Sequence, residues 1–154
     1  MTVAEKLVEL YKSSGKTCAT AESCTGGGIG AAITSVAGSS EVFLGGIISY
    51  ANEVKRDVLG VAAQVLDEHG AVSSETAAQM AEGARKLMKA DVAVAVTGIA
   101  GPGGGSAEKP VGLVWFGLAT ADGVRTEKAI FPGDREQVRS ATVTHALGML
   151  TTAI

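Results

Sequence analysis

The sequence has 154 residues, of which 46% are hydrophobic and 19% charged, so a single domain over residues 1–154 can bury a core. A net charge of −3 gives no basic surface for nucleic acid, and we expect no nucleic-acid partner. No apolar run approaches the roughly 18 residues of a membrane span, and no secretion signal opens the chain. We therefore expect a cytoplasmic protein with no membrane partner.

The first predicted helix begins after Thr2, which forms a capping box with Glu5, and ends at Gly15. A short apolar run over residues 17–19 predicts a strand. Residues 20–28 then form a turn that carries hydroxyl groups and glycines and opens a helix to about residue 36. A helix start has about four unpaired N–H groups and a partial positive charge, so this turn suits an anion or a developing oxyanion.

The apolar run of residues 42–50 has two central glycines, Gly45 and Gly46. It predicts a buried strand that a helix or a ligand approaches closely. Short helices are expected over residues 52–59 and 61–68, and Ser73 is placed to cap a longer amphipathic helix.

The second half of the chain begins with the clearest buried strand, residues 92–97. Residues 98–110 contain five glycines and two prolines and cannot form regular structure. Two further strands joined by a hairpin turn are expected over residues 111–130, and Asp134 with Gln137 caps the last helix.

Strands that alternate with helices, followed by one hairpin, predict an α/β protein. We expect a three-layer α/β/α sandwich with a mixed, mostly parallel sheet. Ligands of such sheets bind beyond the carboxyl ends of the strands. Ser23, Tyr50 and Thr97 all lie at predicted strand ends, so we expect them to converge.

Ser23 is the candidate nucleophile, although a hydroxyl before a glycine-led helix is also typical of a simple N-cap. A serine needs a base, and Tyr50 and Lys55 are the plausible groups near the other strand ends. Lysine acts as a base only when neutral, so burial would have to lower its pKa of about 10.4 by roughly 3 units. Tyr50 could act as a relay between Ser23 and Lys55. The alternative is that Tyr50 only ends a strand and that Lys55 is solvated.

The remaining nucleophiles and bases do not form a recognisable site. Cys18 and Cys24 match no metal-ligand spacing, and we expect both thiols to be reduced. His69 and His145 are isolated from other ligand types, so we expect no metal.

The glycine-rich segment over residues 98–110 follows a buried strand, and the exposed N–H groups of such a turn can bind an anion. Arg135, at the start of the last helix, could add charge-assisted contacts to a phosphate or carboxylate. A surface turn and an ordinary surface arginine are the alternatives.

A reductase is a rival class, because Gly26-x-Gly28-x-x-Ala31 fits a loose dinucleotide fingerprint and Tyr50 precedes Lys55. Both matches are flawed. The Tyr–Lys spacing differs by one residue from that of short-chain reductases, and Glu41 comes too early to bind a ribose.

Taken together, these segments resemble the C-terminal domain of the competence/damage-inducible CinA family. The resemblance spans nearly the whole chain. The matching pieces are Ala21-Glu22-Ser23-Cys24-Thr25-Gly26-Gly27, Tyr50-x-Asn52-x-x-Lys55, Gly70-Ala71-Val72-Ser73, Thr97-Gly98-Ile99-Ala100-Gly101-Pro102, Gly104-Gly105, Lys109-Pro110-Val111-Gly112 and Phe131-x-Gly133-Asp134-Arg135.

The resemblance implies a nicotinamide-nucleotide amidase that needs no cofactor and converts nicotinamide mononucleotide to nicotinate mononucleotide and ammonia. Ser23 would be the nucleophile, Lys55 the base and Tyr50 an assisting group. Backbone N–H groups near Cys24 and Thr25 are placed to stabilise the oxyanion. The substrate-binding residues would be Gly26, Asn52, Thr97, Gly98, Ala100, Gly101, Gly104 and Arg135.

The family also suggests a homo-oligomer. Within the protein, we expect the phosphate of the ligand near Arg135 and the second glycine segment, away from the reaction centre. A nucleotide-binding regulatory module without turnover remains the alternative from a different class.

Overall fold

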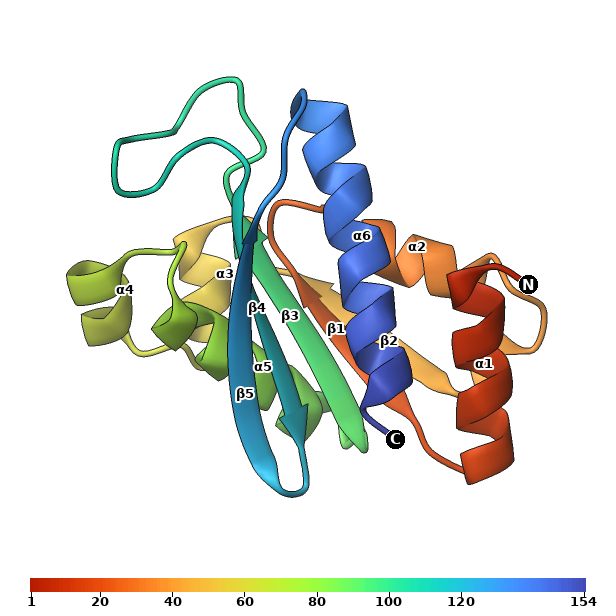
Figure 1. Cartoon of the computed structure of the whole chain (residues 1–154). Helices are drawn as coiled ribbons and strands as arrows, with labels where there is room; N and C mark the ends of the chain where they lie inside the picture. Colours follow the sequence, from red (N-terminus) through yellow and green to blue (C-terminus); the bar gives the residue numbers. More distant parts are fainter.

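The computed structural model describes residues 1–154 and contains a five-stranded sheet between two layers of helices (Figure 1). The elements in chain order are α1 (Val3–Ser14), β1 (Cys18–Glu22), α2 (Gly28–Thr34), η1 (Ser39–Glu41), β2 (Phe43–Ile48), α3 (Asn52–Asp57), α4 (Ala63–His69), α5 (Ser74–Met88), β3 (Val92–Gly98), β4 (Leu113–Thr120), β5 (Gly123–Ile130) and α6 (Arg135–Thr152). None of the helices is both long and apolar enough to cross a membrane.

The strands follow the order β2-β1-β3-β4-β5. β1 pairs in parallel with both β2 and β3, whereas β4 pairs antiparallel with β3 and β5. β4 therefore runs opposite to the other strands, which all point the same way. The predicted mixed, mostly parallel sheet is confirmed.

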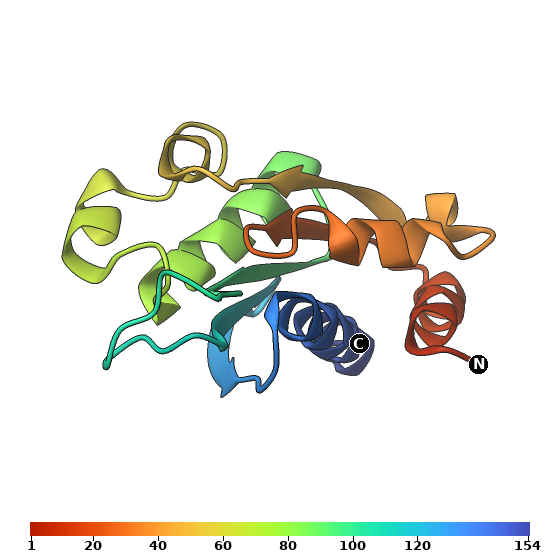
Figure 2. The same ribbon diagram turned by 90° about the horizontal axis from the view of Figure 1, so that it is seen from above.

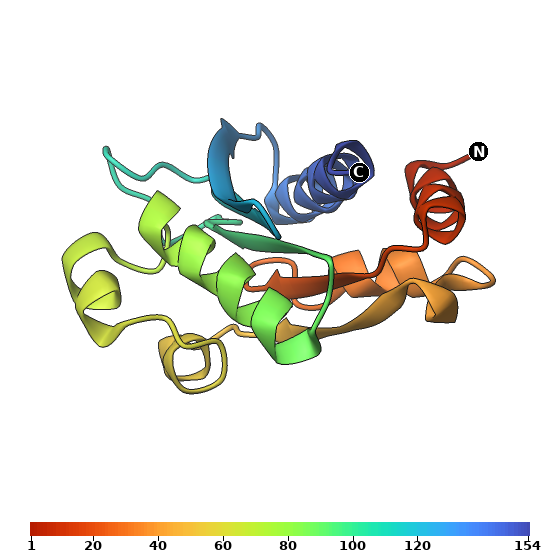
Figure 3. The ribbon, with the colours of Figure 1, turned by 90° about the horizontal axis from the view of Figure 1, so that it is seen from below.

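The two helical layers cover opposite faces of the sheet, as Figures 2 and 3 show. α5 lies along one face, above small side chains such as Ala93 and Ala95. Gly117 allows this close approach, since a Cβ at that position would collide with the carbonyl oxygen of Ala77. On the other face α6, α1 and α2 enclose the larger of the two buried apolar clusters.

The predicted helix caps are present. The Thr2 hydroxyl accepts a hydrogen bond from the Glu5 N–H, and Gly15 ends α1 with a positive φ of 67°. Asp134 and Gln137 form a complete capping box at the start of α6. Local sequence signals therefore set these helix ends directly.

Two predicted strands differ from the structure. β1 continues to Glu22, so the turn begins at Ser23 rather than at residue 20. β2 is an edge strand, not a buried one, and its Leu44 and Ile48 side chains are 46% and 56% exposed. An apolar run shows that a strand can be buried, but it does not show whether a neighbouring strand covers it.

The shared strand direction brings four chain segments to one edge of the sheet. β1, β2 and β3 all end there, and so does β5, from which a short connection leads to the first turn of α6 (Figure 1). This is the edge at which open α/β sheets bind ligands.

Candidate active site

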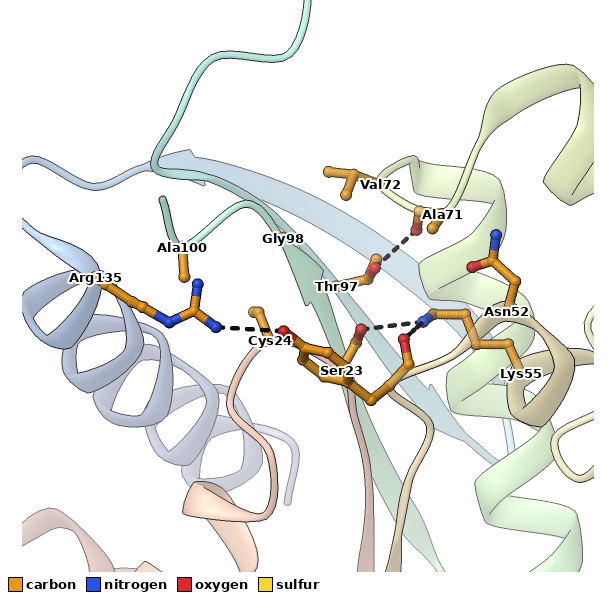
Figure 4. A pocket seen from close by; sticks show the side chains of 11 residues that line it. Ser23, Cys24, Asn52, Lys55, Ala71, Val72, Thr97, Gly98, Ala100 and Arg135 are labelled. Carbon is orange, nitrogen blue, oxygen red and sulfur yellow. Dashed lines mark hydrogen bonds between the residues drawn. The ribbon is translucent and has the colours of Figure 1, made fainter. Parts of the chain in front are cut away.

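A pocket of about 220 Å³ opens at the carboxyl edge of the sheet (Figure 4). Its volume is below the roughly 300–1,000 Å³ typical of pockets for drug-sized ligands, so a ring and its substituent fit better than a whole nucleotide. The lining residues come from five segments and are Ser23, Cys24, Tyr50, Asn52, Lys55, Ala71, Val72, Thr97, Gly98, Ala100 and Arg135.

Ser23 is the first residue after β1 and is held by both neighbouring strands. Its N–H donates to the Val96 carbonyl at 3.1 Å, and the preceding carbonyl of Glu22 accepts from the Ser49 N–H at 2.7 Å. The side chain does not cap α2, because that helix begins at Gly28 with Gly27 as its N-cap. The N-cap interpretation of Ser23 is therefore wrong, and its hydroxyl is free for the pocket.

Lys55, on α3, is only 1% exposed and points its amine into the pocket. The nitrogen Nζ lies 3.0 Å from Ser23 Oγ and donates to the carbonyls of Ser49 at 2.7 Å and Tyr50 at 3.1 Å. Burial lowers the pKa of Lys55, with a smaller opposing contribution from Cys24. The interpretation of Lys55 as a solvated residue is wrong.

A neutral amine can make all three contacts of Lys55. A neutral amine has two N–H groups and one lone pair, and the two carbonyls can take both N–H groups. The lone pair is then left for the hydroxyl proton of Ser23. No carboxylate forms an ion pair with Lys55, so the two carbonyls and Cys24 offset only part of the cost of burying its charge.

Tyr50 contributes its carbonyl to Lys55, not its phenol. The side chain is 62% exposed, and its hydroxyl accepts a hydrogen bond from Arg135 Nη2 at 3.3 Å. It makes no hydrogen bond to Ser23 or Lys55, so the expected proton relay is not formed. In Figure 4 Arg135 lies across the pocket from Lys55, and the two residues mark its opposite ends.

The start of α2 does not face the pocket as a free anion site. The buried carboxylate of Glu22 already accepts the N–H groups of Ile29 at 2.9 Å and Gly30 at 3.0 Å. It also accepts the hydroxyl of Thr25 at 2.6 Å. The expectation that the helix start holds the oxyanion is therefore wrong, because Glu22 occupies it.

The turn between Ser23 and α2 keeps two N–H groups unpaired. Gly26 donates to the Ser23 carbonyl at 3.1 Å, whereas the N–H groups of Cys24 and Thr25 have no partner in the protein. Unpaired N–H groups next to a nucleophile have the chemistry of an oxyanion hole. Gly26 takes a positive φ of 59° in this turn and does not line the pocket.

The Cys24 thiol lines the pocket next to Ser23, but it is a poor nucleophile. Burial raises the pKa of this thiol to about 11, and Arg139 opposes the shift only in part. The neutral thiol is the unreactive form. Ser23 therefore remains the nucleophile candidate on this turn.

Thr97, at the end of β3, closes the pocket floor. Its hydroxyl donates to the Ala71 carbonyl at 2.7 Å, which ties the sheet to the connection between α4 and α5. Because the proton is committed there, the Thr97 oxygen can only accept a hydrogen bond from a ligand. Asn52, the first residue of α3, lines the pocket on the same side as Lys55 (Figure 4).

The glycine-rich segment takes a smaller part than expected. Only Gly98 and Ala100 line the pocket, while Gly101 offers its carbonyl to Arg135 Nη1 at 2.9 Å. Gly104 and the rest of residues 102–108 are exposed and lie away from the pocket. Figure 1 shows this loop extending above the sheet.

Four contributors to the site were missed in the sequence. Ser49 and Ala71 act through backbone carbonyls, which no side-chain pattern reveals. Glu22 anchors the turn, and its position inside the hydroxyl-rich segment was the available signal. Arg139 binds the carbonyls of Cys24 and Thr25, and its spacing of one helical turn from Arg135 was the clue.

The reductase alternative is wrong. The Glu22 carboxylate occupies the helix start that a dinucleotide pyrophosphate would need. The phenol of Tyr50 meets Arg135, while Lys55 meets Ser23, so the Tyr–Lys pair of a reductase is not formed.

The histidines lie outside the pocket. His145 Nε2 is 3.1 Å from a Glu127 carboxylate oxygen, and its ring packs on Phe116 with centroids 4.2 Å apart. His69 Nδ1 lies 3.5 Å from the Glu75 carboxylate. Neither histidine can serve as the base of Ser23 from its position.

The fold and the site define a class: a three-layer α/β/α domain with a serine–lysine pair at the carboxyl edge of its sheet. The CinA C-terminal domain family matches residues 1–154. The chain therefore belongs to this family. A CinA-like protein of Geotalea daltonii is 52% identical over 149 residues, which are 97% of this chain and 36% of that protein. The chain thus spans about a third of the length of the curated relatives that it matches.

Solved structures agree with this assignment. The competence/damage inducible protein CihA from Agrobacterium tumefaciens superposes with a TM-score of 0.95 at 48% identity, over 97% of this chain and 92% of that one. A CinA superfamily protein from Klebsiella pneumoniae gives a TM-score of 0.94 at 35% identity, over 97% and 94% of the two chains.

Proposed function

We propose that the domain is a serine amidase that hydrolyses the carboxamide of nicotinamide mononucleotide to nicotinate mononucleotide and ammonia, without a metal or cofactor. The observation that carries the proposal is the 3.0 Å contact between Lys55 Nζ and Ser23 Oγ, in a pocket whose lining includes no histidine and no carboxylate. A lysine whose pKa is lowered by burial is a suitable general base for a serine.

The first step is attack on the carboxamide. Neutral Lys55 accepts the hydroxyl proton of Ser23 while Ser23 Oγ forms a bond to the carboxamide carbon. The carbonyl oxygen becomes an oxyanion and accepts hydrogen bonds from the unpaired N–H groups of Cys24 and Thr25. One such donor is commonly worth about 10²–10³ in rate.

The second step expels ammonia. The carbon–nitrogen bond breaks, and protonated Lys55 returns its proton to the leaving nitrogen, which leaves an ester on Ser23. Water then attacks the ester with Lys55 as base, and Ser23 is released with the carboxylic acid product. The carbonyls of Ser49 and Tyr50 keep the amine aimed at Ser23 throughout.

The pocket suggests an orientation for the substrate. The pyridine ring and its carboxamide fill the small pocket, and the Thr97 oxygen accepts an N–H of the amide. A carboxylate product has no such N–H, which favours its release. The ribose phosphate then extends toward Arg135, whose guanidinium can make paired contacts to phosphate oxygens.

The test is ammonia release from nicotinamide mononucleotide in the presence of a chelator. We expect activity from the wild type and from Ser13→Ala, a control on the exposed end of α1, but not from Ser23→Ala. Full activity of Ser23→Ala would exclude Ser23 as the nucleophile. If the ligand raises the melting temperature but no ammonia forms at high enzyme concentration, the domain is a nucleotide-binding regulatory module instead.

A further inference from the structure

Arg139 lies one helical turn after Arg135 on α6, yet its guanidinium binds the protein and not the pocket. Its Nε donates to the Cys24 carbonyl at 3.1 Å, and its Nη2 donates to the Thr25 carbonyl at 3.0 Å. The planar fork of an arginine suits two adjacent carbonyl oxygens, whereas a lysine offers only a point donor. A long-range contact therefore joins the last helix to the turn after Ser23.

Because a peptide unit is planar, a hydrogen bond to its carbonyl also fixes the direction of its N–H group. This applies to the two unpaired N–H groups of the turn, those of Cys24 and Thr25. A trans peptide is planar, and its N–H points opposite to its carbonyl. When Arg139 binds the Cys24 carbonyl, the Thr25 N–H of the same peptide unit must point away from Arg139. The Ser23 carbonyl accepts from Gly26, and this fixes the Cys24 N–H in the same way.

Arg139 is the only hydrogen-bond partner of the Cys24 carbonyl. The Thr25 carbonyl has a second partner, the N–H of Gly28 at 3.0 Å, so that peptide stays partly anchored without the arginine. The peptide unit between Cys24 and Thr25 therefore depends on Arg139 for its orientation. Gly26, with a φ of 59°, gives the backbone next to it additional freedom to rotate.

We propose that Arg139 is a positioning residue that holds the Cys24–Thr25 peptide so that its N–H faces the developing oxyanion. The inference rests on the proposed amidase function. Arg139 touches neither the substrate nor the reacting atoms and acts only through the turn. α6 thus serves the site twice, since Arg135 lines the pocket and Arg139 orients the turn.

The kinetic test separates this role from substrate binding. Because one oxyanion donor is commonly worth about 10²–10³ in rate, we expect Arg139→Ala to lower kcat by about 10- to 100-fold. KM should change by less than about threefold, since the ground-state contacts remain. Arg139→Lys should recover part of the lost kcat, and millimolar guanidinium should rescue Arg139→Ala better than methylammonium at equal ionic strength.

Arg125→Ala is the matched control, because Arg125 is an arginine of β5 whose ion-pair partner is Glu127, outside the pocket. It should leave kcat and KM unchanged. A melting curve for each variant shows whether the fold persists. An Arg139→Ala protein that folds and keeps the wild-type kcat would overturn the proposal, as would a defect confined to KM.

A second measurement does not depend on turnover. The amide ¹H–¹⁵N resonances of Cys24, Thr25 and Gly26 should shift in Arg139→Ala but not in Arg125→Ala. Unchanged resonances would overturn the positioning role. If the wild type released no ammonia, the amidase proposal would fail by itself, and these spectra would still decide whether Arg139 orders the turn.

Discussion

The amine of Lys55 lies 3.0 Å from the hydroxyl oxygen of Ser23, although the two residues are 32 positions apart in the chain. β1 ends at Ser23, and α3 brings Lys55 back over the same edge of the sheet. The amine is buried without a carboxylate partner, so its charged form is destabilised. The same burial that prepares the base also opposes folding, and both effects can be measured.

The stability of the protein should depend on the protonation of Lys55. Its pKa is lowered in the folded state, so between that value and the unfolded value of about 10.4 the unfolded chain binds more protons. The free energy of unfolding therefore rises with pH across this window. Lys55→Met removes the group, and its melting temperature relative to the wild type should be higher at pH 7 than near pH 10.

Lys6→Met, a change at an exposed lysine of α1, is the control and should show no such trend. A difference between Lys55→Met and the wild type that stays constant from pH 7 to about pH 10 would show that Lys55 is charged in the folded protein.

The rate of hydrolysis should also depend on the protonation of Lys55. The value of kcat/KM should rise with pH as Lys55 loses its proton, with a midpoint below the ordinary lysine pKa of about 10.4. The measurement is ammonia release over a pH series, with the stability of the enzyme checked at each point. A midpoint at or above about 10.4 would contradict a base prepared by burial.

Arg135 should act on the phosphate end of the substrate. Arg135→Ala should raise the KM for nicotinamide mononucleotide by about tenfold, in line with the loss of a charge-assisted hydrogen bond at a partly exposed site. The KM for nicotinamide riboside, which has no phosphate, should change much less. Equal effects on both substrates would show that Arg135 acts through Gly101 and Tyr50 instead, the two residues that it contacts in the structure.

Both the stability of the protein and its kcat/KM should depend on the Thr97 hydroxyl. Thr97→Val keeps the shape but removes the acceptor for the amide N–H and leaves the Ala71 carbonyl without its partner. We expect a loss of about 1–2 kcal/mol in stability and a reduction of about tenfold in kcat/KM. Thr97→Ser retains the hydroxyl and should restore most of both quantities. Failure of Thr97→Ser to recover either quantity would indicate that the methyl group matters more than the oxygen.

The sequence predicted the layered fold and most of its elements because local signals set them. Thr2 and Asp134 cap their helices as expected, and apolar periodicity marks β3 and α5. The convergence of Ser23, Tyr50 and Thr97 on one pocket could also be predicted, since parallel strands end at the same edge. The exposure of each strand could not be predicted, because it depends on the order of the strands in the sheet. β2 lies at the edge of the sheet and is therefore partly exposed.

The parts of the site that escaped prediction depend on backbone atoms and on long-range contacts. The direction of the Tyr50 phenol is set by Arg135, which is 85 positions away. The glycine-led start of α2 predicts an anion site, but the Glu22 carboxylate already accepts its N–H groups. Arg139 reaches Cys24 across 115 positions, and its spacing from Arg135 indicates only the side of α6 on which it lies.

The central claim is that Ser23 forms an ester with the acyl group of the substrate. The most direct test is acid quenching of the enzyme during turnover of nicotinamide mononucleotide, followed by mass spectrometry of the intact protein and its peptides. We expect a mass increase equal to the acyl group of nicotinate mononucleotide, located on the peptide that contains Ser23 and absent from Ser23→Ala. Turnover by the wild type without an adduct at any quench time, or an adduct on a residue other than Ser23, would contradict the account.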